Sequence, residues 1–387
     1  MRVPRLTLDD LRARFAERPA ALLDMVEDIA ARLSRSGEPG GLPTPMAADA
    51  LRAAARTLLT DAPDPASRPL WGVPYAVSDS IDVAGLPSMA GVPGLAYVAD
   101  CDADLVGRLK AAGALLVGKT GLASPDLTTA SPDTGTAIVN GLVAFTVGIS
   151  ALDHAAGTVV SVRPSPGDIS TAGIFAFAPH LDRLDIDAAD LGTASAVRVV
   201  TAGHRAGRPA GALPAPLRVG VVKADRPASA QLNQRGWSTV GIEGAIFSEL
   251  SGWLRDGPWA AERLVELETV IAEVPDVFEA VIGARLGRAR AMSAVEVFRA
   301  YERLRLAQRR LAAAAATFDV LLAPAALPLS ACGWASVAVP VTDRESPAAL
   351  AWFGPAGSDD TLAEIATLFA SSPSPAMATA PLASPHP

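Results

Sequence analysis

Cysteine is one of the rarest residues in this sequence of 387 residues, which holds only Cys101 and Cys332. Two isolated cysteines form neither a disulfide framework nor a zinc motif, so we expect two reduced thiols. The first residues, MRVPRLTLDDLRARF, lack the apolar stretch of a signal peptide. No uncharged apolar run reaches the roughly 18 residues that a membrane span needs. We therefore expect a cytoplasmic protein without a membrane partner.

Lysine is almost as scarce, because only Lys110, Lys119 and Lys223 are lysines among the 33 basic residues. Any reaction that uses a lysine as its base must use one of these three. The sequence also lacks the C-x-x-C, H-x-x-x-H and clustered acidic patterns of metal sites. No G-x-G-x-x-G or Walker motif follows a predicted strand, so we expect neither a cofactor nor a metal. The net charge of -8 and the pI of about 5.1 give no electrostatic reason to expect nucleic acid as a partner.

Hydrophobic residues, by contrast, make up half of the chain, and the mean hydropathy is +0.29. This apolar content is enough for a sizeable core. Strand signals at 70–77 and 114–119 enclose a helix signal at 103–112, a spacing that predicts a parallel crossover. Further strands and helices alternate along the chain. The pattern predicts one α/β domain over residues 1–370, followed by a disordered tail rich in Pro, Ser and Ala at 371–387.

Three segments carry more specific expectations. Residues 121–136 are rich in Ser, Thr, Asp, Pro and Gly, and predict a loop. The apolar run 136–148 fits a buried helix or a strand, and its periodicity does not choose between them. Ser293 and Glu296 form an S-x-x-E capping box at the start of a predicted helix over 294–316.

Several stretches resemble motifs of the amidase signature family. PLWGVPYAVSDSIDVAGLPSMAG at 69–91 is similar to that family's G-V-P-x-x-x-K-D-x-x-D-x-x-G-x-x-T-x-x-G segment. The stretch at 102–122 resembles the helix and strand that end in G-K-T-N. Residues 162–173 and 180–191 resemble the next two motifs. This resemblance implies an amidase-signature α/β/α fold, in which helices flank a large mixed central sheet.

The second half of the chain resembles the allophanate hydrolase branch of the family, over residues 256–311 and the FDVLLAPAALP that follows them. The resemblance covers about residues 7–370. Members of this family often form dimers, so a homodimer or another protein partner is an expectation that the resemblance implies.

The family hydrolyses amides with a Ser–Ser–Lys triad, in which a buried neutral lysine is the base and one serine attacks the carbonyl. The resemblance implies that this triad is not intact here. Ser78 stands where the family has its lysine. Pro132 or Asp133 falls at the relay serine, and His154 or Ala156 falls at the nucleophile. Because loss of a nucleophile or a base costs many orders of magnitude in rate, we predict no Ser–Ser–Lys hydrolysis.

Six polar residues are the candidates for a remodelled pocket: Ser78, Asp79, Asp133, Thr134, Thr136 and His154. His154 could act as a general base that Asp133 or Asp79 orients. Structural interpretations stay open for each of them. Ser78 and Asp79 could line a loop, the two threonines could flank a plain turn, and His154 could lie on the surface. We expect Lys119 to end a strand and pair with a carboxylate.

Three functions remain open from the sequence. In the first, the pocket binds or transforms a small amide-like or carbonyl-bearing molecule without an acyl-enzyme. In the second, the chain is an inactive pseudoenzyme that serves as a structural or regulatory partner. In the third, an unrecognised set of residues hydrolyses amides. Fold alone does not choose among them, since function depends on the site.

Overall fold

The computed structural model describes residues 5–35, 41–89, 96–121, 132–150, 158–176, 178–202, 213–222, 232–244, 259–273, 287–325, 327, 329–340 and 349–370. The predicted tail at 371–387 lies outside these ranges. The helices are α1 (Leu8–Glu17), α2 (Ala21–Arg35), α3 (Ala48–Asp61), α4 (Asp104–Ala111), α5 (Pro132–Val139), α6 (Leu191–Thr201), α9 (Trp259–Glu273), α11 (Ala294–Ala315) and α12 (Asp359–Ala370). No helix in these ranges is both long and apolar enough to cross a membrane.

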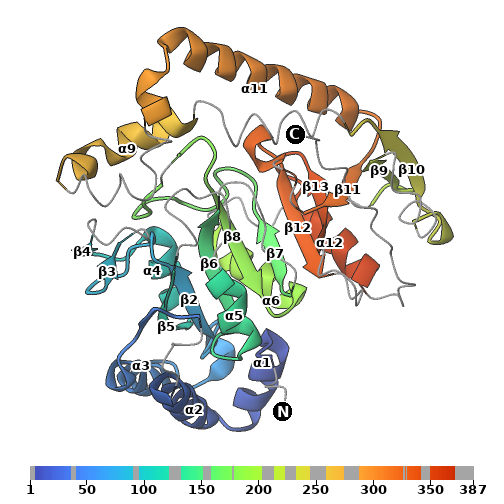
Figure 1. Ribbon diagram of the computed structural model, residues 1–387. Helices are drawn as coiled ribbons and strands as arrows, with labels where there is room; N and C mark the ends of the chain where they lie inside the picture. Colours follow the sequence, from blue (N-terminus) through green and yellow to red (C-terminus); the bar gives the residue numbers. More distant parts are fainter. Residues whose placement is uncertain are drawn as a thin grey trace.

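One large mixed sheet runs through the molecule, as the sequence predicted (Figure 1). Its strands are β1 (Thr44–Pro45), β2 (Pro74–Ser78), β5 (Leu115–Thr120), β6 (Phe145–Ser150), β7 (Val160–Arg163), β8 (Arg183–Ala188), β9 (Arg218–Val222), β10 (Ser238–Ile242), β11 (Val320–Pro324), β12 (Ala335–Pro340) and β13 (Ala349–Gly354). Their order across the sheet is β1-β5-β2-β6-β8-β7-β12-β13-β11-β9-β10. A separate short ribbon pairs β3 (Pro87–Ser88) with β4 (Tyr97–Val98).

The predicted parallel crossover is confirmed at β2, α4 and β5. Val77 of β2 lies beside Lys119 of β5 in parallel register, and β6 pairs in parallel with the other side of β2. Every residue of β2 and β5 is buried, which is typical of parallel strands covered on both faces. The other parallel pairs are β9 with β10 and β9 with β11.

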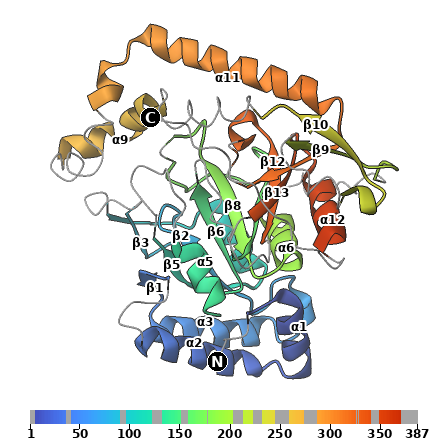
Figure 2. The ribbon, with the colours of Figure 1, turned by 45° about the vertical axis from the view of Figure 1, so that its right-hand side comes forward.

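Helices gather at both ends of the sheet. Helices α1, α2 and α3 form one end, whereas α11 crosses the opposite end in both ribbon views (Figure 2). Helix α11 begins as predicted, because the side chain of Ser293 accepts from the Glu296 backbone and Glu296 caps Ser293 in return. Such a reciprocal cap satisfies two of the N–H groups that a helix start leaves unpaired.

The prediction of a loop over residues 121–136 was wrong for its last part. Residues from Pro132 onward form α5, which ends at Val139. Proline fits the first turn of a helix because its fixed φ is already helical and its missing N–H is not needed there. The apolar run 136–148, for which a helix and a strand were the alternatives, contains parts of both. Helix α5 ends before Gly141 (φ +62°), and strand β6 begins at Phe145.

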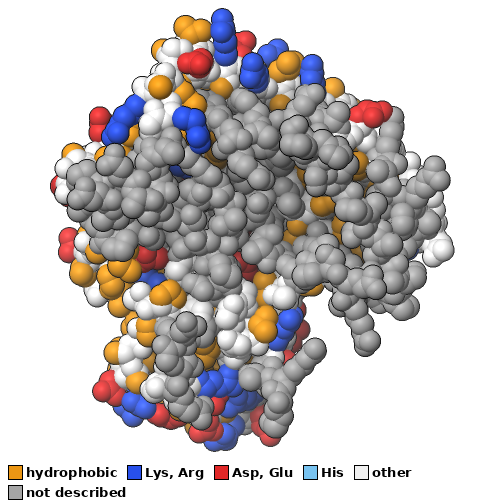
Figure 3. All heavy atoms as spheres, in the orientation of Figure 1, with side chains coloured by type: hydrophobic (Ala, Val, Ile, Leu, Met, Phe, Trp, Pro, Cys, Tyr) orange, Lys and Arg blue, Asp and Glu red, His pale blue; other side chains and the backbone are white. Residues whose placement is uncertain are grey.

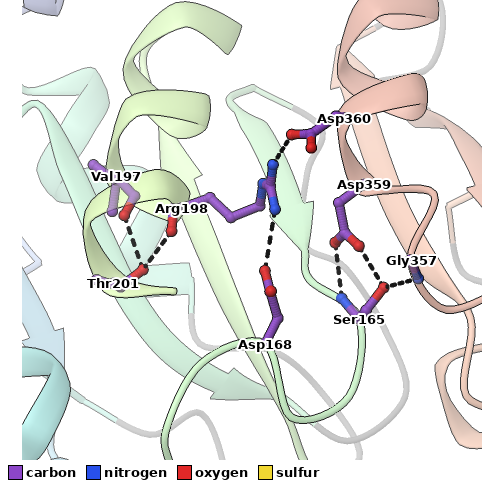
Figure 4. A network of polar contacts seen from close by, with 8 residues as sticks. All are labelled: Ser165, Asp168, Val197, Arg198, Thr201, Gly357, Asp359 and Asp360. Atoms are coloured by element: carbon purple, nitrogen blue, oxygen red, sulfur yellow. Dashed lines mark hydrogen bonds and ion pairs between the residues drawn. The ribbon is translucent and has the colours of Figure 1, made fainter. Parts of the chain in front are cut away.

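A buried polar network fastens α12 to the sheet (Figure 4). The carboxylate of Asp359 accepts from the backbone N–H and the hydroxyl of Ser165. Arg198 of α6 donates to Asp168 and Asp360, the first at 3.1 Å. Burial and the nearby Asp359 raise the pKa of Asp168, and Arg198 opposes this shift. The network joins residues that follow β7 to the first turn of α12.

Candidate functional site

The candidate site lies where three parallel strands end. Strands β5, β2 and β6 run in the same direction and finish at Thr120, Ser78 and Ser150. Their carboxyl ends therefore meet at one edge of the sheet, the position at which open α/β sheets bind ligands. Ser78 lies in register with Thr120, and its other neighbour on the sheet is Gly148.

Ser78 forms a buried hydroxyl pair with Ser80. Both residues are almost fully buried, and their Oγ atoms lie 2.7 Å apart. On the neighbouring strand, a Cβ added at Gly148 would make an ordinary van der Waals contact with the Ser78 Cβ, at 3.5 Å. A serine hydroxyl has a lone pair but no basicity near neutral pH, so this pair has no proton acceptor of its own.

Lys119 reaches the same edge from β5 and is completely buried. Its Nζ lies 2.8 Å from the Pro87 carbonyl oxygen, 2.8 Å from the Ser88 Oγ and 3.3 Å from the Asp79 carbonyl oxygen. The two carbonyls can only accept. The Ser88 hydroxyl donates its own hydrogen to Asp82 at 2.8 Å, so it too must accept from the lysine. Three donated bonds define an ammonium group, which has no lone pair left to take up a proton.

The surroundings of Lys119 lower its pKa. Burial is the largest cause of this shift, and the carboxylates of Asp79 and Asp82 oppose it. The expected carboxylate partner is thus wrong as a direct contact, because the hydrogen-bond partners in the described part of the chain are two carbonyls and a hydroxyl. Lys119 fastens the segment between β2 and β3 to the end of β5.

A further tyrosine extends this cluster to the surface. The Tyr97 hydroxyl donates to the Asp82 carboxylate at 2.7 Å, and Tyr97 is 42% exposed. Partial burial and the bond to Asp82 raise the pKa of Tyr97 to about 12. Asp82, Ser88 and Tyr97 are not among the residues predicted from the sequence. Asp82 and Ser88 stand at the D and T positions of the motif at 69–91, which was the available signal.

The six predicted pocket residues have different outcomes. Ser78 and Asp79 are buried at the strand edge, and the Asp79 carboxylate accepts from the Met89 N–H at 3.3 Å. Thr136 is exposed on α5. Asp133 and Thr134 also belong to α5 rather than to a turn. His154 lies outside the described residues.

A cavity of about 340 Å³ opens at the end of β6, and its lining touches the residues after β2 through the backbone of Ser80 and Ile81 rather than through the hydroxyl pair. One wall is the segment 171–176, in which the Phe175 N–H donates to the Ser80 carbonyl at 2.8 Å and Ile174 bridges to Ile81. The other walls come from Ile149 at the end of β6, from Asp182 and Arg183 at the start of β8, and from Glu266 of α9. This volume is within the range of small-molecule sites.

Arg183 is the cation of this cavity. Its guanidinium donates to the backbone carbonyls of Asp182 at 2.8 Å and His180 at 3.0 Å. Burial and the nearby Arg163 lower the pKa of Arg183. Arg163 itself is neutralised, because it forms a buried two-pronged ion pair with Asp185 at 2.6 and 2.8 Å. Within the described ranges, no group of His, Cys, Asp and Glu side chains is placed to hold a metal ion.

Known proteins share part of this sequence and the whole of its fold. Residues 24–134 match the family model described as Amidase. The whole fold resembles the allophanate hydrolase of Kluyveromyces lactis with a TM-score of 0.80 and 20% identity, over 95% of this chain and 72% of that one. Residues 24–134 thus match this family, and the central mixed sheet with flanking helices is the fold of the structural neighbours.

Among curated proteins, the urea amidolyase of Saccharomyces cerevisiae is 31% identical in an alignment of 153 residues that covers 33% of this chain and 8% of that protein. The indoleacetamide hydrolase of Pseudomonas syringae is 28% identical in an alignment of 211 residues that covers 47% of this chain and 42% of that enzyme. The chain therefore spans less than half the length of these two relatives.

Proposed function

We propose that this chain binds or transforms a small amide-like or carbonyl-bearing molecule at the carboxyl edge of β2 and β6, without a Ser–Ser–Lys acyl-enzyme. The proposal rests on the residues at the two positions, 78 and 119, where the amidase signature motifs have a lysine. The first is occupied by Ser78, which is paired with Ser80. The second, Lys119, donates three hydrogen bonds and has no lone pair for a proton.

The cavity at the end of β6 supports the choice of ligand. An amide presents both N–H donors and a carbonyl acceptor, so its site needs groups of both kinds. The carboxylates of Asp182 and Glu266 can accept, and the Arg183 guanidinium and the Thr171 hydroxyl can donate. Apolar residues such as Ile149 and Phe175 form the remaining surface, a mixture that is typical of small-molecule sites.

The reaction is tested first by looking for a covalent intermediate. The intact mass of the protein should be unchanged after incubation with biuret, with acetamide or with a fluorophosphonate probe. A mass increase on any serine would show an acyl- or phosphonyl-enzyme. It would contradict the proposal that no serine of this chain acts as a nucleophile.

Binding is tested with variants of α9. We expect Glu266→Ala to weaken the binding of biuret about tenfold, since a hydrogen bond to a charged group contributes roughly 1.5–3 kcal/mol. Glu268→Ala on the same helix is the matched control and should bind as the wild type does. Equal affinities of both variants in isothermal calorimetry, or no binding by the wild type, would contradict the proposed ligand site.

A second function, that of a pseudoenzyme acting through a protein partner, is favoured by the outer face of α11. Val295, Phe298 and Leu306 are 56%, 71% and 45% exposed on this helix. Arginines lie among them, and Figure 3 shows blue and orange side chains together along the top of the molecule, where α11 runs. If α11 joins two copies, Phe298→Glu should halve the mass measured by light scattering. If light scattering shows that the wild-type chain is a monomer, α11 does not join two copies, and the partner in this second function is not a second copy of the chain.

A further inference from the structure

A larger cavity, of about 480 Å³, lies between α3 and the first residues of β5. It is separate from the cavity beside Ser80, because none of its lining residues is shared with that cavity. Helix α3 contributes one face to it, and the segment 83–86 forms the opposite wall. Nothing in the proposed amide chemistry uses this cavity.

The floor of the cavity is hydrocarbon. Leu51 and Leu58 of α3 are 1% and 6% exposed, and Leu115 and Leu116 of β5 are also buried. Ala54 stands between the two leucines on the same helical face, with a small side chain at the opening. This arrangement offers an apolar tail a continuous surface of aliphatic side chains.

The opposite wall is held open by backbone. Gly85 has a φ of +78°, and a Cβ added there would meet nothing within 4 Å. The wall is fixed from behind, since the Ala84 N–H donates to the Asp102 carboxylate at 3.0 Å. Gly85 therefore borders open space, and the bond from Ala84 to Asp102 anchors its segment.

The charged side chains at the rim of the cavity differ in whether a neighbouring residue already neutralises them. The Lys110 ammonium is neutralised by Asp102, whose two oxygens lie 2.8 Å from it. Arg68 is half-buried, its stem packs near Gly113, and its guanidinium makes no hydrogen bond or ion pair to a described residue. Asp61 is exposed at the rim. Arg68 is thus the cation that remains for an incoming anion.

We propose that this cavity binds an amphipathic carboxylate, whose hydrocarbon chain lies on the leucine floor and whose carboxylate pairs with Arg68. The planar guanidinium of Arg68 can donate two parallel hydrogen bonds to a carboxylate. A ligand with a hydrocarbon chain and one negative charge can therefore contact the leucines and Arg68 at the same time. A volume of about 480 Å³ falls in the range of small-molecule sites.

The first experiment measures the dissociation constants of hexanoate, octanoate and 1-octanol for the wild-type chain by isothermal calorimetry. We expect octanoate to bind with one site per chain. Each added methylene should tighten binding roughly fourfold, the factor that follows from its transfer out of water. 1-Octanol should bind at least about tenfold more weakly than octanoate, since it lacks the charge that Arg68 recognises. Equal affinities along the series or for the alcohol would overturn the proposal.

Two pairs of variants locate the site. Ala54→Trp fills the opening and should weaken octanoate binding more than tenfold, whereas Ala53→Trp, on the same helix but away from the cavity, should bind as the wild type does. Arg68→Gln should weaken octanoate about tenfold and leave 1-octanol unchanged. Circular dichroism confirms that each variant is folded. Undiminished binding by Ala54→Trp, or an equal loss for acid and alcohol in Arg68→Gln, would place the ligand elsewhere.

Discussion

Lys119 and Ser78 lie on neighbouring strands at one edge of the sheet. The buried polar groups around them differ in whether each donor and acceptor has a hydrogen-bond partner, that is, whether it is matched. All three hydrogens of the Lys119 ammonium have acceptors, and the Ser88 hydroxyl continues the chain of bonds to Asp82. Near Ser78, by contrast, the hydroxyls of Thr120 and Thr146 are fully buried and have no partner among the described residues.

This difference separates two kinds of buried polar cluster. A cluster whose donors and acceptors are all matched stabilises the fold, whereas an unmatched buried hydroxyl costs free energy of folding. Unmatched groups are retained where something other than stability has shaped the site. The matched bonds of Lys119 indicate a structural role for this residue, and the unmatched hydroxyls lie on the side of the edge for which we propose a ligand.

The largest expected effect comes from removing the matched ammonium. Lys119→Met would leave two buried carbonyls without a donor, and we expect the free energy of unfolding to fall by about 3–5 kcal/mol. Urea unfolding measures the loss. Lys110→Met removes the other described lysine, whose pair with Asp102 is partly exposed, and should cost less than about 1 kcal/mol. If Lys119→Met and Lys110→Met lower the free energy of unfolding by similar amounts, the buried bonds of Lys119 do not stabilise the fold more than the exposed pair of Lys110 does.

A smaller effect of opposite sign is expected on the unmatched side. Thr146→Val replaces the buried hydroxyl by a methyl group of the same shape and keeps a β-branched residue in β6, so the free energy of unfolding should rise by about 1 kcal/mol. Ser88→Ala, which removes a matched hydroxyl, should lower it by about 1–3 kcal/mol. If Thr146→Val is instead destabilising, its hydroxyl has a partner and the two sides of the edge do not differ.

The smallest effect is expected at alkaline pH. Because the pKa of Tyr97 is raised from 10.0 to about 12, the folded chain holds this proton more tightly than the unfolded chain does. Its contribution to stability is fully present below pH 10 and is lost as the pH rises from 10 to about 12. Tyr97→Phe should therefore flatten this part of the profile of unfolding free energy against pH. Superimposable slopes for the variant and the wild type would contradict the bond from Tyr97 to Asp82 as its cause.

The fold was predictable because its signals are local or lie in motifs of fixed order. The Ser293 and Glu296 cap set the start of α11, and the spacing of strand, helix and strand predicted the parallel pairing of β2 with β5. The loop predicted up to residue 136 was wrong because composition alone does not distinguish a loop from a short helix that begins with Pro132 and is held by packing.

The site was predictable only in part. The motif at 69–91 identified Ser78 and Asp79 by position, and both are buried at the strand edge. The partners of Lys119 were not predictable, because Pro87 and Ser88 reach it through the register of β5 and the course of the segment after β2. Hydrogen-bond partners far apart in sequence follow from tertiary structure, which residue patterns do not specify.

The pairing of β7 with β12 has a consequence for how the chain is made. Val162 lies beside Val337, so the middle of the sheet joins strands that leave the ribosome far apart in time, roughly 10–35 s at about 5–20 residues per second. Until then the backbone of β7 presents one row of N–H and C=O groups that other chains can pair with. During this interval an unpaired β7 edge is a place at which nascent chains can associate, and the pairing with β12 removes it.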